Sequence, residues 1–290
     1  MRDAPDDDPA LTTRQRMARA LARSDALFHA LSDGTLLSFA LDAGTFQRVS
    51  DLVMASGRAR RLVNVQRAGP STGMPTRTQQ GDLIEAAYAS HGDTKHVLLL
   101  PQDPNECFSF SAQALDLADR LQTPIFVMTD LDIGMNQRLC EPFEWDDKQT
   151  YDRGKVMSAE ELEAGRDFGR YKDVDGDGIP WRTLPGTHPT KGSYFTRGTT
   201  RDPYARYSER GPDYIYNMER LMRKFQTAAD LVPQPMLREA PQATQWGVLY
   251  FGSTTPAMEE AFDQMAQLGM HFNGLRLRAY PFPQSVKTFI

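Results

Sequence analysis

From residue 62 onward, short apolar runs alternate along the chain with amphipathic stretches. The runs at 62–65, 96–100 and 123–130 have the length and the flanking turn residues of buried strands. Between them, residues 82–89 and 104–121 repeat their apolar positions with the period of a helix. Alternating strands and helices are typical of parallel βαβ units with right-handed crossovers. This part of the chain is therefore predicted to be an α/β domain built on a parallel sheet.

The second of these helices carries a clear start signal. Asp103 can cap its amino end, and Pro104 suits the first helical position. Glu106 can reach back to complete a capping box. The helix is therefore predicted to begin at Pro104.

The pattern is less regular before residue 62. Residues 1–11 are acidic and contain proline, and we expect them to be disordered. A loose apolar stripe predicts a helix that starts at Thr12 or Thr13 and runs to about Leu31. Residues 36–41 fit a strand, and residues 49–55 fit a short helix.

After residue 137 the character changes again. Residues 138–240 are rich in Tyr, Arg, Asp, Gly and Pro and have few long apolar runs, apart from an amphipathic helix at 213–231. A strand at 246–253, a helix at 256–268 and a strand at 275–278 then follow. This succession predicts the start of a second α/β domain.

Composition excludes several classes of protein. The net charge of −5 and the lack of a basic tract argue against a nucleic-acid partner. The chain has no apolar run of the ~20 residues that a membrane helix needs, and its acidic start lacks a secretion signal. Its two cysteines, Cys107 and Cys140, are too few for an iron–sulfur cluster that takes four thiolates. We interpret them as reduced thiols of a cytoplasmic protein.

The strand at 62–65 breaks into a loop rich in Gly, Pro, Ser and Thr, and Arg67 stands at the break. Ligands of open α/β sheets bind beyond the carboxyl ends of the strands, and a guanidinium can hold a carboxylate through two parallel hydrogen bonds. Gly69 lets the backbone approach a ligand closely, while Ser71 and Thr72 offer hydroxyl groups. A plain turn with a solvated arginine fits the same spacing.

Three other groups of residues can carry chemistry, and each has a plainer interpretation. Asp130 and Asp132, at the end of a predicted strand, can bind a metal or cap a helix. The stretch from Asp173 to Asp177 begins like a calcium loop, but Leu184 stands where the loop needs a glutamate, so a tight turn is favoured. His188 is interpreted as a loop histidine rather than a catalyst.

The stretch 66–76, Gln-Arg-Ala-Gly-Pro-Ser-Thr-Gly-Met-Pro-Thr, followed by Gln-Gly-Asp-Leu at 80–83, resembles the α subunit of 2-oxoacid:ferredoxin oxidoreductases, most closely the 2-oxoglutarate branch. The Asp-Gly-Asp-Gly-Ile-Pro stretch at 175–180 is also similar to this family. The resemblance implies a parallel-sheet pyrimidine-binding domain of the thiamine-diphosphate type, an irregular connecting arm and the start of a second α/β domain.

The resemblance also implies an activity and its partners. Enzymes of this family oxidatively decarboxylate a 2-oxoacid with thiamine diphosphate and Mg²⁺, pass the acyl group to coenzyme A, and send electrons through an iron–sulfur cluster to ferredoxin. The β subunit holds the diphosphate, the Mg²⁺ and usually the cluster. By resemblance Arg67 binds the C1 carboxylate, Thr76 faces the distal group of the substrate, and Gly69, Ser71 and Thr72 shape the cofactor wall. No residue of this chain is assigned a catalytic role or a metal.

Three elements of the family are absent between Met1 and Arg61: a Tyr-Pro-Ile-Thr-Pro-type turn, a glutamate for the thiamine aminopyrimidine, and a Thr-Ser-Gly-Pro-Gly-type loop. We therefore expect an atypical segment at 1–61 that is not native family sequence, a partial domain at 62–137, an arm at 138–240 and a truncated domain at 241–290. An inactive fragment or a non-catalytic assembly subunit is the rival interpretation. The sequence leaves the 2-oxoacid, the electron acceptor and the oligomeric state open.

Overall fold

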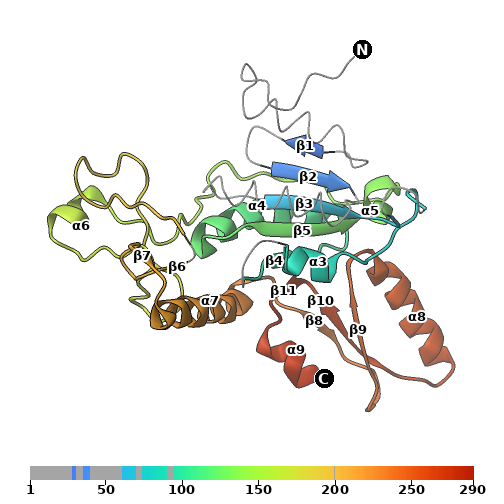
Figure 1. Ribbon diagram of the computed structural model, residues 1–290. Coiled ribbons are helices and arrows are strands. Elements are labelled where there is room, and N and C mark those ends of the chain that lie inside the picture. The colour runs from blue at the N-terminus through green and yellow to red at the C-terminus, as the bar shows by residue number, and fades with distance from the viewer. Residues whose placement is uncertain (1–27, 31–34, 40–60, 70–73, 90–93, 199) are drawn as a thin grey trace, which may run out of the picture.

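The computed structural model describes residues 28–30, 35–39, 61–69, 74–89, 94–198 and 200–290. Its main sheet has six strands in the order β1-β2-β3-β5-β4-β11 (Figure 1). The inner strands β2, β3, β5 and β4 run parallel, and β1 and β11 pair antiparallel at the edges. The strands are β1 (Phe28–Ala30), β2 (Thr35–Phe39), β3 (Arg61–Gln66), β4 (Val97–Leu99), β5 (Ile125–Asp130) and β11 (Ala279–Tyr280).

Side-chain alternation along these strands divides the core into two layers. Val97 and Val127 point to one face of the sheet, where they pack with α4 (Pro104–Leu121) and α7 (Gly211–Leu231). Leu98 and Phe126 point to the other face, where they pack against α3 (Leu83–Ala87). Because successive residues of a strand face opposite sides, strands covered on both faces read as continuous apolar runs.

Helix α4 begins as its sequence predicts. The Asp103 carboxylate accepts a hydrogen bond from the Glu106 amide at 2.8 Å, and Pro104 is the first helical residue. The Glu106 carboxylate does not complete a capping box on the Asp103 amide; it accepts instead from the Gln102 amide at 3.0 Å. The helix ends at Leu121, and the next residue, Gln122, caps it. The left-handed backbone of Gln122, with a φ of 51°, turns the chain toward β5.

The arm extends from the sheet on the side of the molecule away from α8 (Figure 1). It contains little regular structure before its long helix, which lies beneath α4 and carries Phe225 and Ala228 into the core. The helix was predicted from its apolar stripe, and the structure confirms it. The arm contains α6 (Ala159–Glu163), β6 (Thr200–Arg201), β7 (Tyr207–Ser208) and α7, whereas the short helix α5 (Leu131–Met135) directly follows β5 at the end of the main sheet.

The last part of the chain forms a smaller α/β unit. Its sheet has the order β8-β10-β9, in which β9 and β10 run parallel and β8 is antiparallel to β10. After β10 the chain returns to the main sheet, where it adds β11 as an edge strand beside β4. The segment that follows the smaller sheet is therefore part of the main sheet. The elements are β8 (Met236–Arg238), β9 (Gly247–Phe251), the 3₁₀ turn η1 (Gly252–Thr254), α8 (Thr255–Gln267), β10 (Asn273–Leu277) and α9 (Gln284–Phe289).

The predicted fold class is confirmed, and one expectation near the amino terminus is wrong. The helix expected to reach Leu31 is replaced at Phe28–Ala30 by a strand that pairs with β2. The preceding part of that helix, and the helix expected at 49–55, lie outside the described residues. The strand predicted at 36–41 is present as β2.

Candidate functional site

The carboxyl ends of β3 and β5 meet at one edge of the sheet. Gln66, the last residue of β3, lies opposite Asp130, the last residue of β5. The buried Gln66 side chain donates to the Thr129 carbonyl at 3.4 Å and accepts from the Asp82 amide at 3.4 Å. These two bonds hold both strand ends to the start of α3. Arg67 follows Gln66 directly and therefore enters the loop from a fixed position.

The loop after Arg67 folds back on itself. The Ala68 amide donates to the Arg77 carbonyl at 2.7 Å, and the Arg77 amide donates to the Met74 carbonyl at 2.9 Å. The second bond closes a turn with Pro75 and Thr76 in the middle, where the fixed φ of proline is favoured. Thr76 is exposed at this turn.

Arg67 reaches this turn from the opposite side of the loop. Its Nη1 donates to the Pro75 carbonyl at 3.3 Å, which places the guanidinium next to Thr76. Its Nε is shielded from solvent and has no hydrogen-bond partner among the described residues. Gly69 is exposed at the start of the loop, and Ser71 and Thr72 lie outside the described residues. The structure thus places the Arg67 guanidinium at the turn that includes Thr76, with no direct contact between the two side chains among the described interactions.

The smaller unit closes over the same strand ends. The buried Asp130 carboxylate accepts from the Ile133 amide at 3.0 Å, as a helix cap. Its other oxygen accepts from the Ser253 hydroxyl and from Gln80 Nε2 at 3.5 Å. The Thr254 hydroxyl donates to Gln80 Oε1 at 3.1 Å. Gln80, which the sequence analysis named only as part of the Gln-Gly-Asp-Leu string and gave no role, therefore links the Arg67 loop to the turn η1.

Asp132 is also engaged in structural contacts. Its amide donates to the Thr78 hydroxyl at 2.6 Å, and its carboxylate forms an ion pair with Arg138. Within the described ranges, no three His, Cys, Asp or Glu side chains gather in a way that could hold a metal ion. Asp130 thus caps α5, as its plainer interpretation predicted, whereas the Asp132 carboxylate pairs with Arg138 and caps none of the described helices.

Burial changes the pKa of two further groups near this edge of the sheet. It raises the pKa of Asp82, although a hydrogen bond with Asn64 lowers that pKa in part. Burial also raises the pKa of the Cys107 thiol to about 11, so this thiol stays protonated at neutral pH despite its contact with Thr129 at 3.6 Å. Cys107 and Cys140 form no disulfide.

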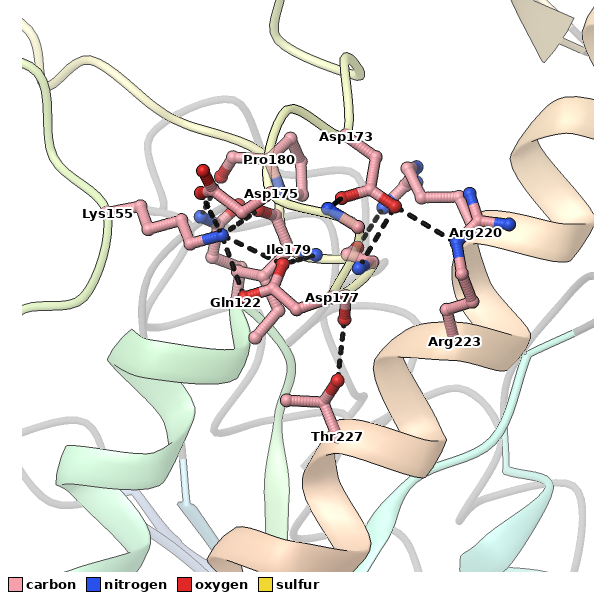
Figure 2. A network of polar contacts seen from close by, with 12 residues as sticks. Gln122, Lys155, Asp173, Asp175, Asp177, Ile179, Pro180, Arg220, Arg223 and Thr227 are labelled. Carbon is pink, nitrogen blue, oxygen red and sulfur yellow. Dashed lines mark hydrogen bonds and ion pairs between the residues drawn. The ribbon is translucent and has the colours of Figure 1, made fainter.

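The ammonium group of Lys155 contacts the carboxylates of the calcium-like loop at 173–178 (Figure 2). Lys155 Nζ contacts Asp175 Oδ2 at 2.6 Å and Asp177 Oδ1 at 2.8 Å, and it donates to the Ile179 carbonyl at 3.0 Å. The Asp173 carboxylate accepts from two backbone amides of the loop and from Arg223 Nε at 3.0 Å. The carboxylates that a calcium ion would need are thus already neutralised by basic side chains.

The same loop fastens the arm to the rest of the molecule. The Thr227 hydroxyl donates to the Asp177 carbonyl at 2.8 Å, and Arg220 Nη1 donates to the Gly178 carbonyl at 3.0 Å (Figure 2). On the other side, Gln122 Nε2 donates to the Pro180 carbonyl at 2.6 Å. The loop is therefore a structural joint between α7 and the end of α4.

His188 holds a loop of the arm. Its Nδ1 accepts from the amides of Thr190 at 3.1 Å and Lys191 at 2.9 Å, so Nε2 carries the proton that faces the Glu163 carboxylate. Both ring nitrogens are engaged, which agrees with the interpretation of His188 as a loop histidine.

An open hollow of about 620 Å³ lies between α4 and the segment around Trp145 and Tyr151. It includes Arg61, at the beginning of β3, whereas Arg67 follows the end of that strand. A strand of this length spans ~20 Å, so the hollow and the Arg67 loop are separate places.

Comparison with known proteins assigns the chain to a family. Residues 44–227 match the family model described as pyruvate flavodoxin/ferredoxin oxidoreductase, thiamine diphosphate-binding. The chain belongs to this family. The match includes the parallel strands β3, β4 and β5, the Arg67 loop and most of the arm, and it begins inside the segment 1–61 that we expected to be atypical. The four domain boundaries stay predictions.

Curated relatives carry related names. Subunit alpha of 2-oxoacid:ferredoxin oxidoreductase 2 from Aeropyrum pernix is 27% identical over 275 residues, covering 92% of this chain and 41% of the relative. The 2-oxoglutarate synthase subunit KorA from Methanothermobacter thermautotrophicus is 42% identical over 82 residues, which cover 28% of this chain and 22% of that subunit. The chain thus spans less than half the length of these relatives.

A solved structure has the same fold. The 2-oxoglutarate:ferredoxin oxidoreductase from Magnetococcus marinus, with 2-oxoglutarate, coenzyme A and succinyl-CoA bound, aligns with a TM-score of 0.71 and 22% identity. The alignment covers 85% of this chain and 42% of that chain. At this identity the likeness concerns the fold alone. No helix in the described part of the chain is long and apolar enough to cross a membrane.

Proposed function

We propose that this chain forms the α-subunit part of a thiamine-diphosphate-dependent oxidoreductase that converts 2-oxoglutarate to its acyl-CoA and passes electrons to ferredoxin. Membership of the family supports the reaction class, and the KorA relatives favour 2-oxoglutarate. The proposal includes a β subunit that holds Mg²⁺ and the iron–sulfur cluster. It also includes a cytoplasmic location, in keeping with two cysteines that form no disulfide.

The geometry of Arg67 is the observation that carries this proposal. Nη1 is already held by the Pro75 carbonyl, and Nε lacks a partner. Nε and Nη2 form one edge of the guanidinium, with two parallel N–H groups that match the two oxygens of a carboxylate. A 2-oxoacid bound by this edge would give Nε the partner that it lacks, at the carboxyl ends of parallel strands where ligands of such folds bind.

The neighbouring residues are assigned by their place in the same loop. Thr76 is exposed beside the guanidinium and is proposed to face the distal group of the substrate. Gly69, Ser71 and Thr72 are proposed to shape the wall of the cofactor site. Thiamine diphosphate, when bound, supplies the nucleophilic carbon for decarboxylation, and Arg67 fixes the carboxylate that leaves.

A non-catalytic assembly subunit is the second candidate. Residues 1–84 of the sequence contain no glutamate, so this stretch offers no counterpart of the glutamate that, by the family resemblance, binds the thiamine aminopyrimidine. This observation concerns the cofactor rather than the carboxylate contact, and one experiment can separate the two readings.

The experiment co-expresses the chain with the β subunit of a 2-oxoglutarate synthase and measures viologen reduction that depends on 2-oxoglutarate and coenzyme A. Arg67→Ala is expected to lower kcat/KM by about 10²–10³, because a charge-assisted bidentate contact is lost. Arg77→Ala is the matched control, because Arg77 is exposed and only its backbone closes the turn. A stable complex without turnover in the wild type would favour the assembly subunit.

A further inference from the structure

Three arginines surround Tyr171 where the irregular part of the arm meets α7, and Lys224 lies close to two of them, Arg220 and Arg170. The guanidinium carbons of Arg170, Arg201 and Arg220 lie 5.5, 5.1 and 5.7 Å from the centre of the Tyr171 ring. Arg201 Nη1 also donates to the Tyr171 hydroxyl at 3.1 Å. Lys224 lies one helical turn after Arg220, on the same face of α7. We call these four residues the basic cluster.

The basic cluster has a buried floor and a more accessible rim. Arg220 and Lys224 are each only 6% exposed, whereas Arg170 and Arg201 are half-buried. Arg220 Nε is buried and has no hydrogen-bond partner in the part of the chain that the structure describes. Lys224 Nζ lies 5.6 Å from the centre of the Phe225 ring and forms no ion pair with a described residue. An anion that entered past the rim would find unsatisfied donors below it.

The basic cluster forms no ion pair with a carboxylate of the described residues, although Asp173 lies close enough to offset part of the charge of Arg220. The Asp173 carboxylate is itself occupied by Arg223 and two backbone amides. Buried charges are normally paired, because an isolated charge in a protein interior is costly. A negatively charged group from outside these residues would therefore stabilise the basic cluster.

We propose that the basic cluster binds a phosphate-type oxyanion where the segments that carry Arg170 and Arg201 meet α7. Guanidinium groups match the oxygens of phosphate and of carboxylate equally well in shape. A dianion is favoured over a single carboxylate because four basic side chains gather in this one region, with no ion pair to an acidic residue of the described chain. The site is distinct from the Arg67 loop, since the joint is formed beside Gln122, where the chain enters the amino end of β5.

Binding at this place responds to pH through Lys224. Burial, together with the charges of Arg220 and Arg170, lowers the pKa of Lys224 to about 7. Of the other groups around it, Tyr171, Tyr216 and Asp173 act on Arg220, and His96 is uncharged at neutral pH because burial lowers its pKa to about 4. An oxyanion favours the protonated amine, so affinity should fall as pH rises through 7.

The test measures thermal stabilisation of the full chain by sulfate, which stays a dianion between pH 6 and pH 8.5. We expect saturable stabilisation, with an affinity at least about tenfold higher at pH 6 than at pH 8.5. Phosphate should act similarly at pH 7, and acetate should act more weakly. A parallel titration with glycerol phosphate distinguishes a site for a free anion from a site for a phosphate group carried on a larger molecule.

Lys224→Met removes the buried amine while keeping the shape of an unbranched side chain. It should abolish both the saturable effect and its pH dependence, whereas Lys191→Met, at an exposed lysine of the same arm, should leave both unchanged. Arg170→Gln, at the rim, should weaken binding about tenfold and guards against misfolding of the first variant. A sulfate effect that never saturates, or that persists unchanged in Lys224→Met, would overturn the proposal.

Discussion

At the scale of single residues, Gly178 shows how little room the joint leaves. Its φ is +80°, and a Cβ there would lie 2.3 Å from the Lys224 amide nitrogen and 2.4 Å from the Arg220 carbonyl oxygen. Gly178→Ala is expected to lower the free energy of unfolding by about 3–5 kcal/mol, because backbone overlap adds to left-handed strain. Urea denaturation measures this as a lower midpoint.

Gly176 provides the matched control. It has a similar φ of +77°, but nothing lies within 4 Å of an added Cβ. Gly176→Ala should therefore cost only the backbone strain, about 1 kcal/mol. Equal losses in the two variants would mean that α7 does not pack against Gly178 as described.

At the scale of elements, the loop at 173–178 should behave as a joint and not as a calcium site. Lys155→Met is expected to destabilise the protein by about 1 kcal/mol, because Asp175 and Asp177 lose a partly exposed cation that they share. Millimolar calcium should leave the melting temperature of the wild type unchanged and restore part of the loss in Lys155→Met. Calcium that stabilises the wild type as strongly would refute this role of Lys155.

Elements with a local signal were predictable, and those defined by distant partners were not. The start of helix α4 could be predicted from Asp103 and Pro104, because both residues act within its first turn. Strand β11 has only two residues and exists because it pairs with β4, so no periodicity marks it. The site divides in the same way: the break at the end of β3 pointed to Arg67, whereas Gln80 gained its role only when η1 folded against it.

At the scale of the whole molecule, Glu106 joins the two units. Arg276 donates to both of its oxygens, at 2.8 and 2.9 Å, and Arg278 donates at 3.1 Å. Sequence reasoning assigned Glu106 only a capping role, because its arginine partners come from the distant strand β10 and the residue that follows it. Burial alone would raise the pKa of Glu106, but the hydrogen bond and charge of Arg276 lower it overall.

This pKa fixes the sign of a pH effect. The pKa of Glu106 is lower in the folded protein than in the unfolded chain, so the unfolded chain binds a proton more readily as the pH falls. The contribution of Glu106 to stability is therefore fully present above about pH 4.5. It is lost as the pH falls through the folded pKa. Glu106→Gln should lower the free energy of unfolding by about 2–4 kcal/mol at pH 7, since it leaves the buried Arg276 without its carboxylate. The free energy of unfolding of the Glu106→Gln variant should also depend less on pH in the acid range, because the variant lacks the carboxylate that titrates there.

Hydrogen exchange can locate this loss. If Glu106 ties the smaller unit to the main sheet, amides of β9 and β10 should exchange faster in Glu106→Gln while those of β3 and β5 stay protected, because only the contact across the units is removed. Glu260→Gln, at an exposed position of α8, should leave both sets unchanged. Faster exchange throughout both sheets would instead mean that the two units unfold as one, and that Glu106 stabilises the molecule without separating its parts.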